Sequence, residues 1–205
     1  MNSAFTVLLR PAHVMAMASL ALSLSSCAMS SSWRQTHPSV AVQPPPPPLF
    51  EWTNEEATGS PSVKIALNEQ KAYVYRGQTQ VAWTTLASGV EKHPTPTGHF
   101  YVMEKITDKR SNLYGVIENA DGEVVNWDAQ AGVTNIPRGC HFVGAPMPHW
   151  MRLTGGGVGM HQGDIPHPGQ PASHGCIRLP AAMADRLYSV VDVGTPVTVS
   201  GVAPY

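Results

Sequence analysis

The sequence lacks the charge pattern of a nucleic-acid-binding protein. It contains 13 Lys and Arg against 14 Asp and Glu, a formal net charge of −1, and its basic residues are spread along the 205 positions. Binding to phosphate backbones generally needs a basic patch or stripe. We therefore expect no nucleic-acid partner for this chain.

Cysteine is also scarce, which excludes further classes of protein. Cys27, Cys140 and Cys176 are too few and too widely spaced for a disulfide framework or a zinc knuckle. Gly155–Gly157 lacks the Lys and Ser or Thr that follow the glycines of a P-loop, so we interpret it as a turn. We expect no metal and no cofactor.

No apolar run reaches the length of about 20 residues that a membrane-spanning helix needs. An apolar run does extend from Val14 to Leu24, after Arg10 and His13, and its length fits the hydrophobic part of a signal peptide. Export is the simplest interpretation, and the signal peptide would occupy residues 1–26.

The end of this run predicts a lipid anchor. Leu24-Ser25-Ser26-Cys27 resembles the bacterial lipobox, in which the cysteine is acylated and becomes the mature N-terminus. The resemblance implies an anchor at Cys27 and a place in the cell envelope, facing the periplasm. Ala28 in place of Asp resembles lipoproteins of the outer membrane. The alternative is an ordinary signal peptide cleaved near Ala28, with Cys27 incidental.

Residues 27–60 have the composition of a tether. They contain Ser30–Ser32, Pro38, the run Pro44–Pro48 and Gly59-Ser60, with little apolar periodicity. Such a segment would reach roughly 105 Å as polyproline II and roughly 30 Å as a flexible coil. Either length would let an anchored domain search the adjacent cell wall.

Residues 61–201 are predicted to form one mainly β domain with a single core. Val63, Ile65 and Leu67 alternate with polar residues, and a second run at 72–75 follows a polar turn, which predicts a hairpin. Further strands are predicted at 81–86, 100–102, 114–117, 124–125 and 197–199. One helix is predicted to start at Pro180, because proline suits the first helical position. Met183, Leu187 and Val190 then recur at the three- and four-residue spacing of a helix.

The residues that carry chemistry lie between Gly159 and Pro180. This segment contains Gly159-Met160-His161-Gln162-Gly163 and then Ser173-His174-Gly175-Cys176-Ile177-Arg178. A thiol is mostly protonated at neutral pH, so a catalytic cysteine needs a neighbouring base. Cys176 is the candidate nucleophile and His161 its base. Because Gly175 has no side chain, the amides of Gly175 and Cys176 can approach a tetrahedral intermediate and form an oxyanion hole.

The order of these residues resembles the signature of the L,D-transpeptidase (YkuD) family, which has a His, a spacer, Ser-His-Gly-Cys, an apolar residue and Arg. The resemblance continues upstream in Thr95-Pro96-Thr97-Gly98-His99-Phe100 and in Pro148–Arg152, so that it spans roughly residues 62–200. It implies a YkuD-type β-sandwich with one or two short helices.

The resemblance also assigns roles. It makes His161 the base and places His174 along the site, while Arg178 suits a substrate carboxylate. Ser173 is expected beside the substrate as a hydrogen-bonding turn residue rather than a second nucleophile. The family commonly has Gly-Thr or Gly-Ser after the base, where this chain has Gln162-Gly163. A backbone carbonyl near Gln162 is therefore a candidate for the group that orients His161.

Two other interpretations of these residues stay open. Imidazole and thiolate are good zinc ligands, so a metal site is one alternative, with His161, His167, His174 and Cys176 as its ligands. The two prolines that stiffen the loop between these residues argue against it. Cys140 is either a buried thiol or the partner of Cys176 in a disulfide that would switch the nucleophile off.

The family resemblance implies that Cys176 attacks the amide between the third and fourth residues of a peptidoglycan stem peptide, and that D-alanine leaves from an acyl-enzyme. An amine of another stem, a lysine of an envelope lipoprotein or a D-amino acid would then take the acyl group. With water as acceptor the chain would be an L,D-carboxypeptidase or another cysteine hydrolase of the cell wall. A catalytically inert wall-binding module is the alternative from another class.

Overall fold

The computed structural model describes residues 46–202, so the expected signal peptide, Cys27 and most of the expected tether lie outside the described part of the chain. The described residues form two β-sheets and one short helix. The prediction of a mainly β fold with one or two short helices is therefore confirmed. No helix among these residues combines the length and the apolar character needed to cross a membrane.

The first sheet has six strands in the order β1-β4-β3-β2-β11-β5. The predicted hairpin is present, with β2 and β3 paired antiparallel, and β11 inserts between β2, to which it is parallel, and β5. The bounds are β1 (Phe50–Trp52), β2 (Pro61–Ala66), β3 (Lys71–Arg76), β4 (Thr79–Thr85), β5 (Gly98–Tyr101) and β11 (Pro196–Ser200).

Strand β1 lies inside the segment that the sequence assigned to the tether. Phe50 and Trp52 pair with β4, and both pack against the core. Three residues after a proline run are too few to show a two-residue period, so the sequence pattern could not reveal this strand. The folded domain thus includes β1 and begins before Pro61.

The second sheet has five strands in the order β10-β9-β8-β6-β7. Only β9 and β10 pair parallel; the other neighbours are antiparallel. The bounds are β6 (Glu104–Glu118), β7 (Val124–Gln130), β8 (His141–Arg152), β9 (Gly159–Gln162) and β10 (Ile177–Leu179). The predicted helix is α1 (Ala181–Val190), but Pro180 is its N-cap and not its first helical residue, so the helix begins one position later than expected.

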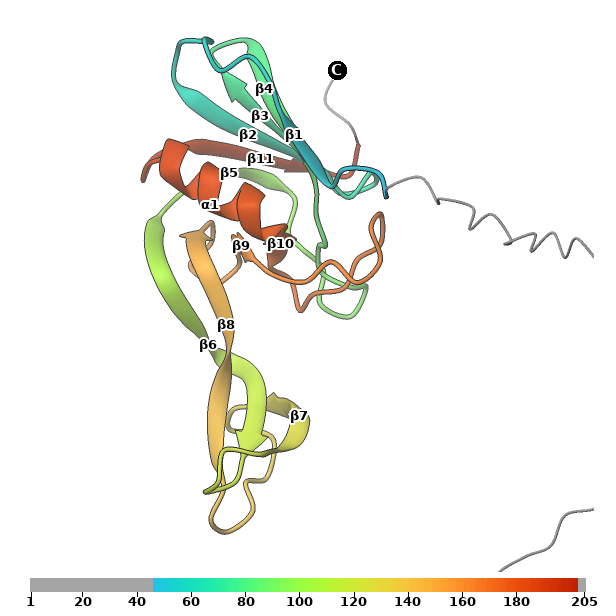
Figure 1. Ribbon diagram of the computed structural model, residues 1–205, viewed down its shortest axis with the longest axis vertical. Helices are drawn as coiled ribbons and strands as arrows, with labels where there is room; N and C mark the ends of the chain where they lie inside the picture. The colour runs from blue at the N-terminus through green and yellow to red at the C-terminus, as the bar shows by residue number, and fades with distance from the viewer. Residues whose placement is uncertain (1–45, 203–205) are drawn as a thin grey trace, which may run out of the picture. The chain divides into compact units, whose positions relative to one another are not determined.

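The core lies between the first sheet, helix α1 and the strands β8–β10 next to it (Figure 1). Met183, Ala184 and Leu187 are the buried face of α1, while Ile177 and Leu179 contribute the buried positions of β10. Truncating a buried leucine such as Leu187 to alanine typically costs about 2–5 kcal/mol. This packing fixes β10, and with it the loop that precedes β10.

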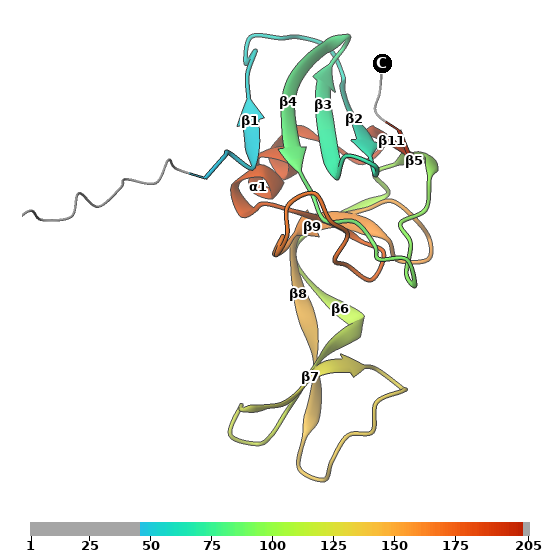
Figure 2. The ribbon, with the colours of Figure 1, turned by 90° about the vertical axis from the view of Figure 1, so that its right-hand side faces the viewer.

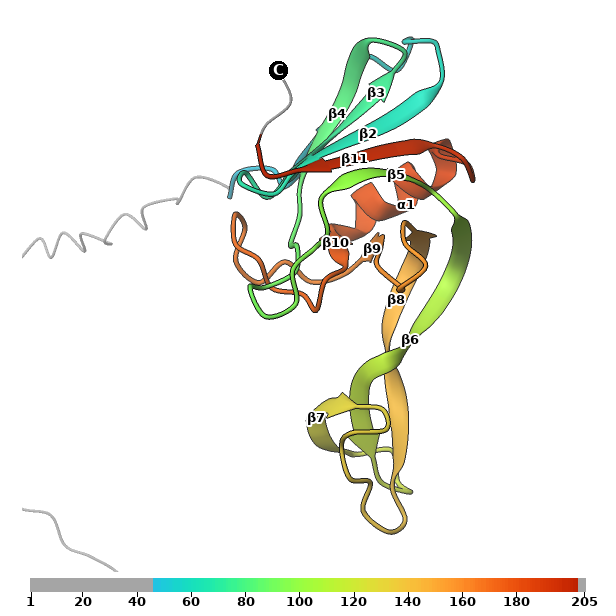
Figure 3. The same ribbon diagram turned by 180° about the vertical axis from the view of Figure 1, so that it is seen from behind.

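Residues 108–148 form an arm that extends away from α1 and the first sheet (Figures 1 and 2). The arm consists of the outer parts of β6 and β8 together with β7, and the view from behind shows the same separation (Figure 3). On the arm β8 pairs only with β6, because its pairing with β9 is confined to Met151 and Arg152. No other strand of the described residues pairs with its second edge there, which explains why the strand accommodates Pro146 and Pro148.

Candidate active site

The residues 173–176, which we call the cysteine loop, lie immediately before β10. Strand β10 pairs in parallel register with β9, so that Arg178 lies opposite His161. Residues in register on neighbouring strands have side chains on the same face of the sheet. The pairing therefore brings the end of the cysteine loop beside the predicted base, which is far from it in sequence.

Cys176 and His161 line one cavity of about 790 Å³ that extends along the base of the arm. Ser173, His174 and Arg178 line the same cavity, whereas Gly175 does not. This volume lies within the range of about 300–1,000 Å³ that is usual for small-molecule sites. Its charged lining residues are Lys109, Arg152, Asp164 and Arg178, and its walls also include Ser111–Tyr114 and Ala145–Pro148 of the arm.

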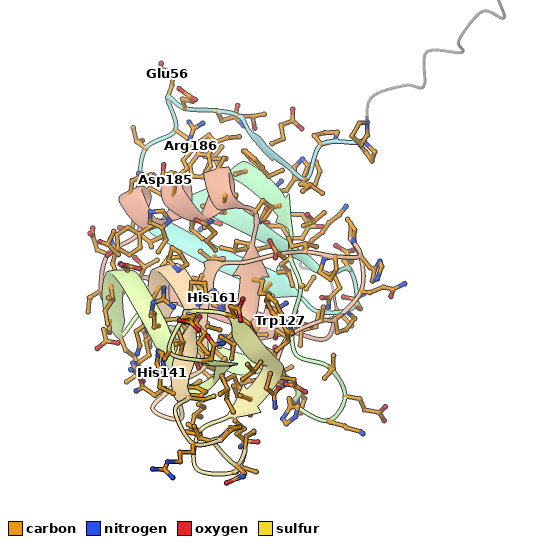
Figure 4. All side chains as sticks on the ribbon, turned by 60° about the horizontal axis from the view of Figure 1, so that its bottom comes forward. Glu56, Trp127, His141, His161, Asp185 and Arg186 are labelled. Atoms are coloured by element: carbon orange, nitrogen blue, oxygen red, sulfur yellow. The ribbon has the colours of Figure 1, made fainter. Side chains whose placement is uncertain are left out.

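One ring nitrogen of His161 forms a hydrogen bond with the backbone. It is 5% exposed, and its Nδ1 lies 2.6 Å from the carbonyl oxygen of Gln162. A carbonyl oxygen can only accept, so Nδ1 carries the proton and Nε2 is left as the basic nitrogen. The expected orienting group is therefore the carbonyl of Gln162 itself. Figure 4 labels His161 together with Trp127 of β7, which is 78% exposed.

Burial keeps the imidazole neutral. Loss of solvent around His161 lowers its pKa to about 4, the carbonyl of Gln162 acts in the opposite direction, and the positive charge of Arg178 lowers the pKa further. Desolvation favours the neutral form of a base because the charged form loses hydration. His161 is thus unprotonated at neutral pH and able to accept a proton.

The thiol of Cys176 is also neutral at rest. Burial raises its pKa, and this outweighs the backbone amide of Gly159 and the charge of Arg178, which both favour the thiolate. Its Sγ lies 3.7 Å from the carbonyl oxygen of Gly157, and no hydrogen bond to His161 is found in the described residues. Catalytic hydrogen bonds are often long in the free enzyme and shorten when substrate binds.

The amide of Gly175 is used inside the cysteine loop. It donates to the hydroxyl oxygen of Ser173 at 3.1 Å, and that hydroxyl donates in turn to the carbonyl of Cys176. Ser173 is 2% exposed and forms an isolated β-bridge with Gly89, and its hydroxyl, which was expected beside the substrate, serves the loop. Gly175 was expected to supply one of two oxyanion-hole amides. Because its N–H is already engaged, the Cys176 amide is the donor that the loop leaves free.

A bulge in β6 brings Tyr114 onto the cysteine loop. Arg110 and Gly115 pair with Pro146 and Gly144, so four residues of β6 stand opposite one residue of β8. The rings of Tyr114 and His174 stack, with centroids 4.3 Å apart and planes 20° apart. Bulges commonly re-aim a side chain beside an active site. The sequence carries no signal for this four-residue irregularity, so the stack of Tyr114 on His174 could not be predicted from it.

Arg178 extends along β9. A Cβ added to Gly163 would lie 2.9 Å from Cγ of Arg178, so the aliphatic part of this side chain packs directly on that glycine. Within residues 46–202 no carboxylate lies within ion-pair distance of its guanidinium. A half-buried guanidinium that lines a cavity in this way is suited to a ligand carboxylate.

The geometry of the described residues supports neither of the two alternatives, the zinc site and the disulfide between Cys140 and Cys176. Among the described residues no group of three or more His, Cys, Asp or Glu side chains is placed to hold a metal, and His167 does not line the cavity. Within residues 46–202 Cys140 and Cys176 are both free, so they are not joined to each other by a disulfide in this structure. The segment with Cys140 leads into β8 at the outer end of the arm (Figure 1).

Comparison with known proteins gives one family and one fold. The family model described as L,D-transpeptidase catalytic domain (YkuD) matches residues 60–199. No curated protein sequence matches the chain at a significant level. An L,D-transpeptidase from Mycobacterium smegmatis superposes with a TM-score of 0.52 at 22% identity, over 69% of this chain and 59% of that one, and shows the fold.

Two solved structures from Enterococcus faecium are more similar in sequence. A cysteine-to-serine mutant of its L,D-transpeptidase has a TM-score of 0.51 and 27% identity, over 70% of this chain and 50% of that one. The catalytic domain of the E. faecium L,D-transpeptidase, solved by NMR, has a TM-score of 0.50 and 29% identity, over 70% of this chain and 98% of that one. This chain therefore spans 50–59% of the two longer proteins and nearly all of the isolated catalytic domain.

Proposed function

The chain belongs to the L,D-transpeptidase catalytic domain (YkuD) family, and from this premise we propose that it is an acyltransferase that acts on peptidoglycan stem peptides through Cys176. One observation carries most of the proposal: Cys176 and His161 line one cavity, and the bond from Nδ1 of His161 to Gln162 leaves Nε2 as the base. A nucleophile and a base oriented by a third group are what covalent acyl transfer requires.

In the first half of the proposed reaction, Nε2 of His161 takes the proton of the Cys176 thiol. Sγ attacks the carbonyl carbon between the third and fourth residues of the stem, and the carbonyl oxygen becomes an oxyanion that accepts from the Cys176 amide. Collapse breaks the C–N bond, and the imidazolium gives its proton to the departing amine of D-alanine. A thioester at Cys176 remains.

In the second half an amine attacks the thioester carbon. A C–N bond forms, the C–S bond breaks, and a proton of the amine passes through His161 to the sulfur. The acceptor would be the amine of another stem, a lysine of an envelope lipoprotein or a D-amino acid. An acceptor held beside the thioester competes with water because a near-attack geometry supplies effective molarities far above its free concentration.

The buried dyad suits this sequence of proton transfers. Burial disfavours both the thiolate and the imidazolium, so the proton moves as Sγ attacks and no stable ion pair has to be dismantled first. Three of the four charged residues that line the cavity are cationic, and Arg178 stands next to His161 across the two strands. Stem peptides carry carboxylates, and we assign one of them to Arg178.

We also propose that the domain works in the cell envelope, held by a lipid on Cys27 and facing the periplasm. The support is the apolar run that ends at Leu24-Ser25-Ser26-Cys27, followed by a Ser- and Pro-rich segment long enough for the domain to reach the wall. Ala28 favours the outer membrane as the site of the anchor.

The test of the reaction is product analysis. The chain is incubated with a purified disaccharide-tetrapeptide, with and without an added D-amino acid, and the products are resolved by mass. Crosslinked or exchanged products that disappear in Cys176→Ala are the expected result. Tripeptide as the main product in excess acceptor would replace the transferase with an L,D-carboxypeptidase. Unchanged substrate and no adduct on Cys176 would leave a wall-binding module.

A further inference from the structure

Thr95 contacts the cysteine loop from a segment 80 residues away in sequence. Its hydroxyl accepts a hydrogen bond from the amide of Gly89 at 2.8 Å and donates one to the carbonyl oxygen of Gly175 at 2.8 Å. The residue is 6% exposed. Both functions of the hydroxyl, donor and acceptor, are therefore used in a place that water does not reach.

The hydrogen bond from Thr95 fixes the orientation of a whole peptide group and not of one carbonyl alone. The carbonyl of Gly175 and the amide of Cys176 belong to one peptide group, which is planar and, in its trans form, directs C=O and N–H in opposite directions. Holding the Gly175 oxygen on the buried side therefore sets the direction of the Cys176 N–H on the other side. This N–H makes no backbone or side-chain hydrogen bond within residues 46–202.

The cysteine loop needs such a support at its centre. Its first residue is held by backbone bonds, from Ser173 N to Ser88 O at 2.9 Å and from Val90 N to Ser173 O at 3.0 Å. Gly175 in the middle has a φ of +107°, a conformation that side chains disfavour and that leaves the following peptide group easy to turn. Among the described residues, Thr95 supplies the only side-chain hydrogen bond to the loop from outside it.

The supporting segment packs against the loop at backbone distance. A Cβ on Gly89 would lie 2.0 Å from the carbonyl oxygen of His93 and 2.8 Å from Cα of Gly175. The segment is itself fixed through Ser88, whose amide donates to Oε1 of the buried Gln70 at 2.8 Å. Thr95 thus acts from a rigid base, which is what a group that sets the direction of an amide requires.

From these contacts we propose that Thr95 is the positioning residue for the oxyanion hole: it turns the Gly175–Cys176 peptide so that the Cys176 amide points at the oxygen of the tetrahedral intermediate. The inference rests on the proposed acyl transfer at Cys176 and adds to it a residue that touches neither the substrate nor the sulfur. Thr95 acts only on steps that pass through an oxyanion, because these alone use the amide.

Two matched pairs of full-length variants isolate the hydroxyl. The first pair is the natural chain and Thr95→Val, whose side chains at position 95 have the same shape and differ in the hydroxyl. The second pair is Thr95→Ser and Thr95→Ala, whose smaller side chains also differ in the hydroxyl. Each protein is treated with p-nitrophenyl acetate, which acylates Sγ through a tetrahedral oxyanion, and with iodoacetamide, which alkylates Sγ without forming one. The second pair keeps the comparison available if Thr95→Val does not fold.

The expected result is that the hydroxyl-free member of each pair acylates at least about tenfold more slowly, since loss of a whole oxyanion-hole donor costs about 10²–10³. Alkylation by iodoacetamide stays unchanged, and with the muropeptide substrate the loss falls on kcat rather than KM. Equal acylation within both pairs would overturn the proposal, and so would a parallel loss of alkylation, which would mean that Thr95 only maintains the fold. A wild-type chain that neither p-nitrophenyl acetate nor the disaccharide-tetrapeptide acylates at Cys176 would instead refute the proposed function itself.

Discussion

The Nδ1 atom of His161 lies 2.6 Å from the carbonyl oxygen of Gln162, the next residue in the chain. The group that orients the base is thus part of the backbone of β9, and it does not depend on the side chain at position 162. This explains how the chain can have Gln162-Gly163 where Gly-Thr or Gly-Ser was expected from the family resemblance. Any side chain that keeps β9 paired with β10 preserves the carbonyl.

The first prediction follows from this arrangement, because a nucleophile and its base act as one unit. We expect Cys176→Ala and His161→Ala each to remove nearly as much transferase activity as the double variant, since the effects of such residues do not add. The measurement is turnover of the disaccharide-tetrapeptide, with Gln162→Ala as the control that keeps the orienting carbonyl. Substantial turnover in either single variant would contradict the assignment of the pair.

The second prediction concerns stability at low pH. The pKa of His161 is lowered from 6.5 to about 4 by burial, so between these values the unfolded chain binds a proton that the folded chain does not. The folded state therefore loses stability as the pH falls through this window, and at about 1.4 kcal/mol per pKa unit the loss reaches about 3 kcal/mol near pH 4. Above pH 6.5 this contribution is constant.

Urea unfolding at pH 7.5 and at pH 4.5 measures this loss, and His161→Gln serves as the control because its side chain does not titrate. The expected outcome is a smaller drop in unfolding free energy for His161→Gln than for the natural chain. Equal drops in the two proteins would show that His161 is not buried in its neutral form. The same low pKa keeps the imidazole able to accept a proton down to about pH 4.

How far the sequence predicts this molecule depends on whether a feature is local. Cys176 and its neighbours form a contiguous run that could be matched to a family signature, and β2 and β3 were found from their alternating apolar residues. The helix after Pro180 was found because its apolar residues recur with a helical period. The arm was not found as a long hairpin, since Pro146 and Pro148 suppress the strand signal of β8 and become compatible with it only at a free edge.

Features of the site that depend on register or on backbone groups were beyond the sequence. The stack of Tyr114 on His174 depends on an irregularity in β6, and the engagement of the Gly175 amide depends on the rotamer of Ser173. Thr95 stood in a motif that was already identified, but its partner is the carbonyl of a residue 80 positions away. Backbone acceptors have no sequence signature, so their partners are found only in the folded structure.

The third prediction tests whether the arm forms one wall of the site. Tyr114→Ala removes the ring that stacks on His174, whereas Tyr114→Phe keeps it. Aromatic pairs contribute about 0.5–1.5 kcal/mol beyond their burial, so we expect KM for the tetrapeptide to rise roughly fivefold in Tyr114→Ala and to change little in Tyr114→Phe. Leu113→Ala, an exposed neighbour that also lines the cavity, is the matched control. An equal rise in KM for Leu113→Ala would show that the stack has no special role.

The fourth prediction concerns the anchor. Cys27→Ser should move the chain from the membrane fraction to the soluble fraction and leave its turnover of soluble muropeptides unchanged, because Cys27 lies outside the catalytic domain. Fractionation with an antibody to the folded domain gives the location, and intact mass gives the lipid. A natural chain that carries no lipid by intact mass would refute the anchor, while Cys140→Ser should leave both measurements as they are.

The last prediction separates the binding of substrate from the chemistry at the sulfur. Arg178 lines the cavity, packs its aliphatic part on Gly163 and has no carboxylate within ion-pair distance among the described residues. If it binds a stem-peptide carboxylate, Arg178→Gln should lower kcat/KM for the tetrapeptide by about 10- to 150-fold, which corresponds to the roughly 1.5–3 kcal/mol of a hydrogen bond to a charged group. Arg178→Lys should recover only part of this loss, because an ammonium cannot make the paired bonds of a guanidinium. Acylation by p-nitrophenyl acetate has no carboxylate to bind and serves as the control, with an unchanged rate expected in both variants. A matching loss with this neutral ester would mean that Arg178 acts on the dyad, whose two members it influences through its charge, and not on the substrate.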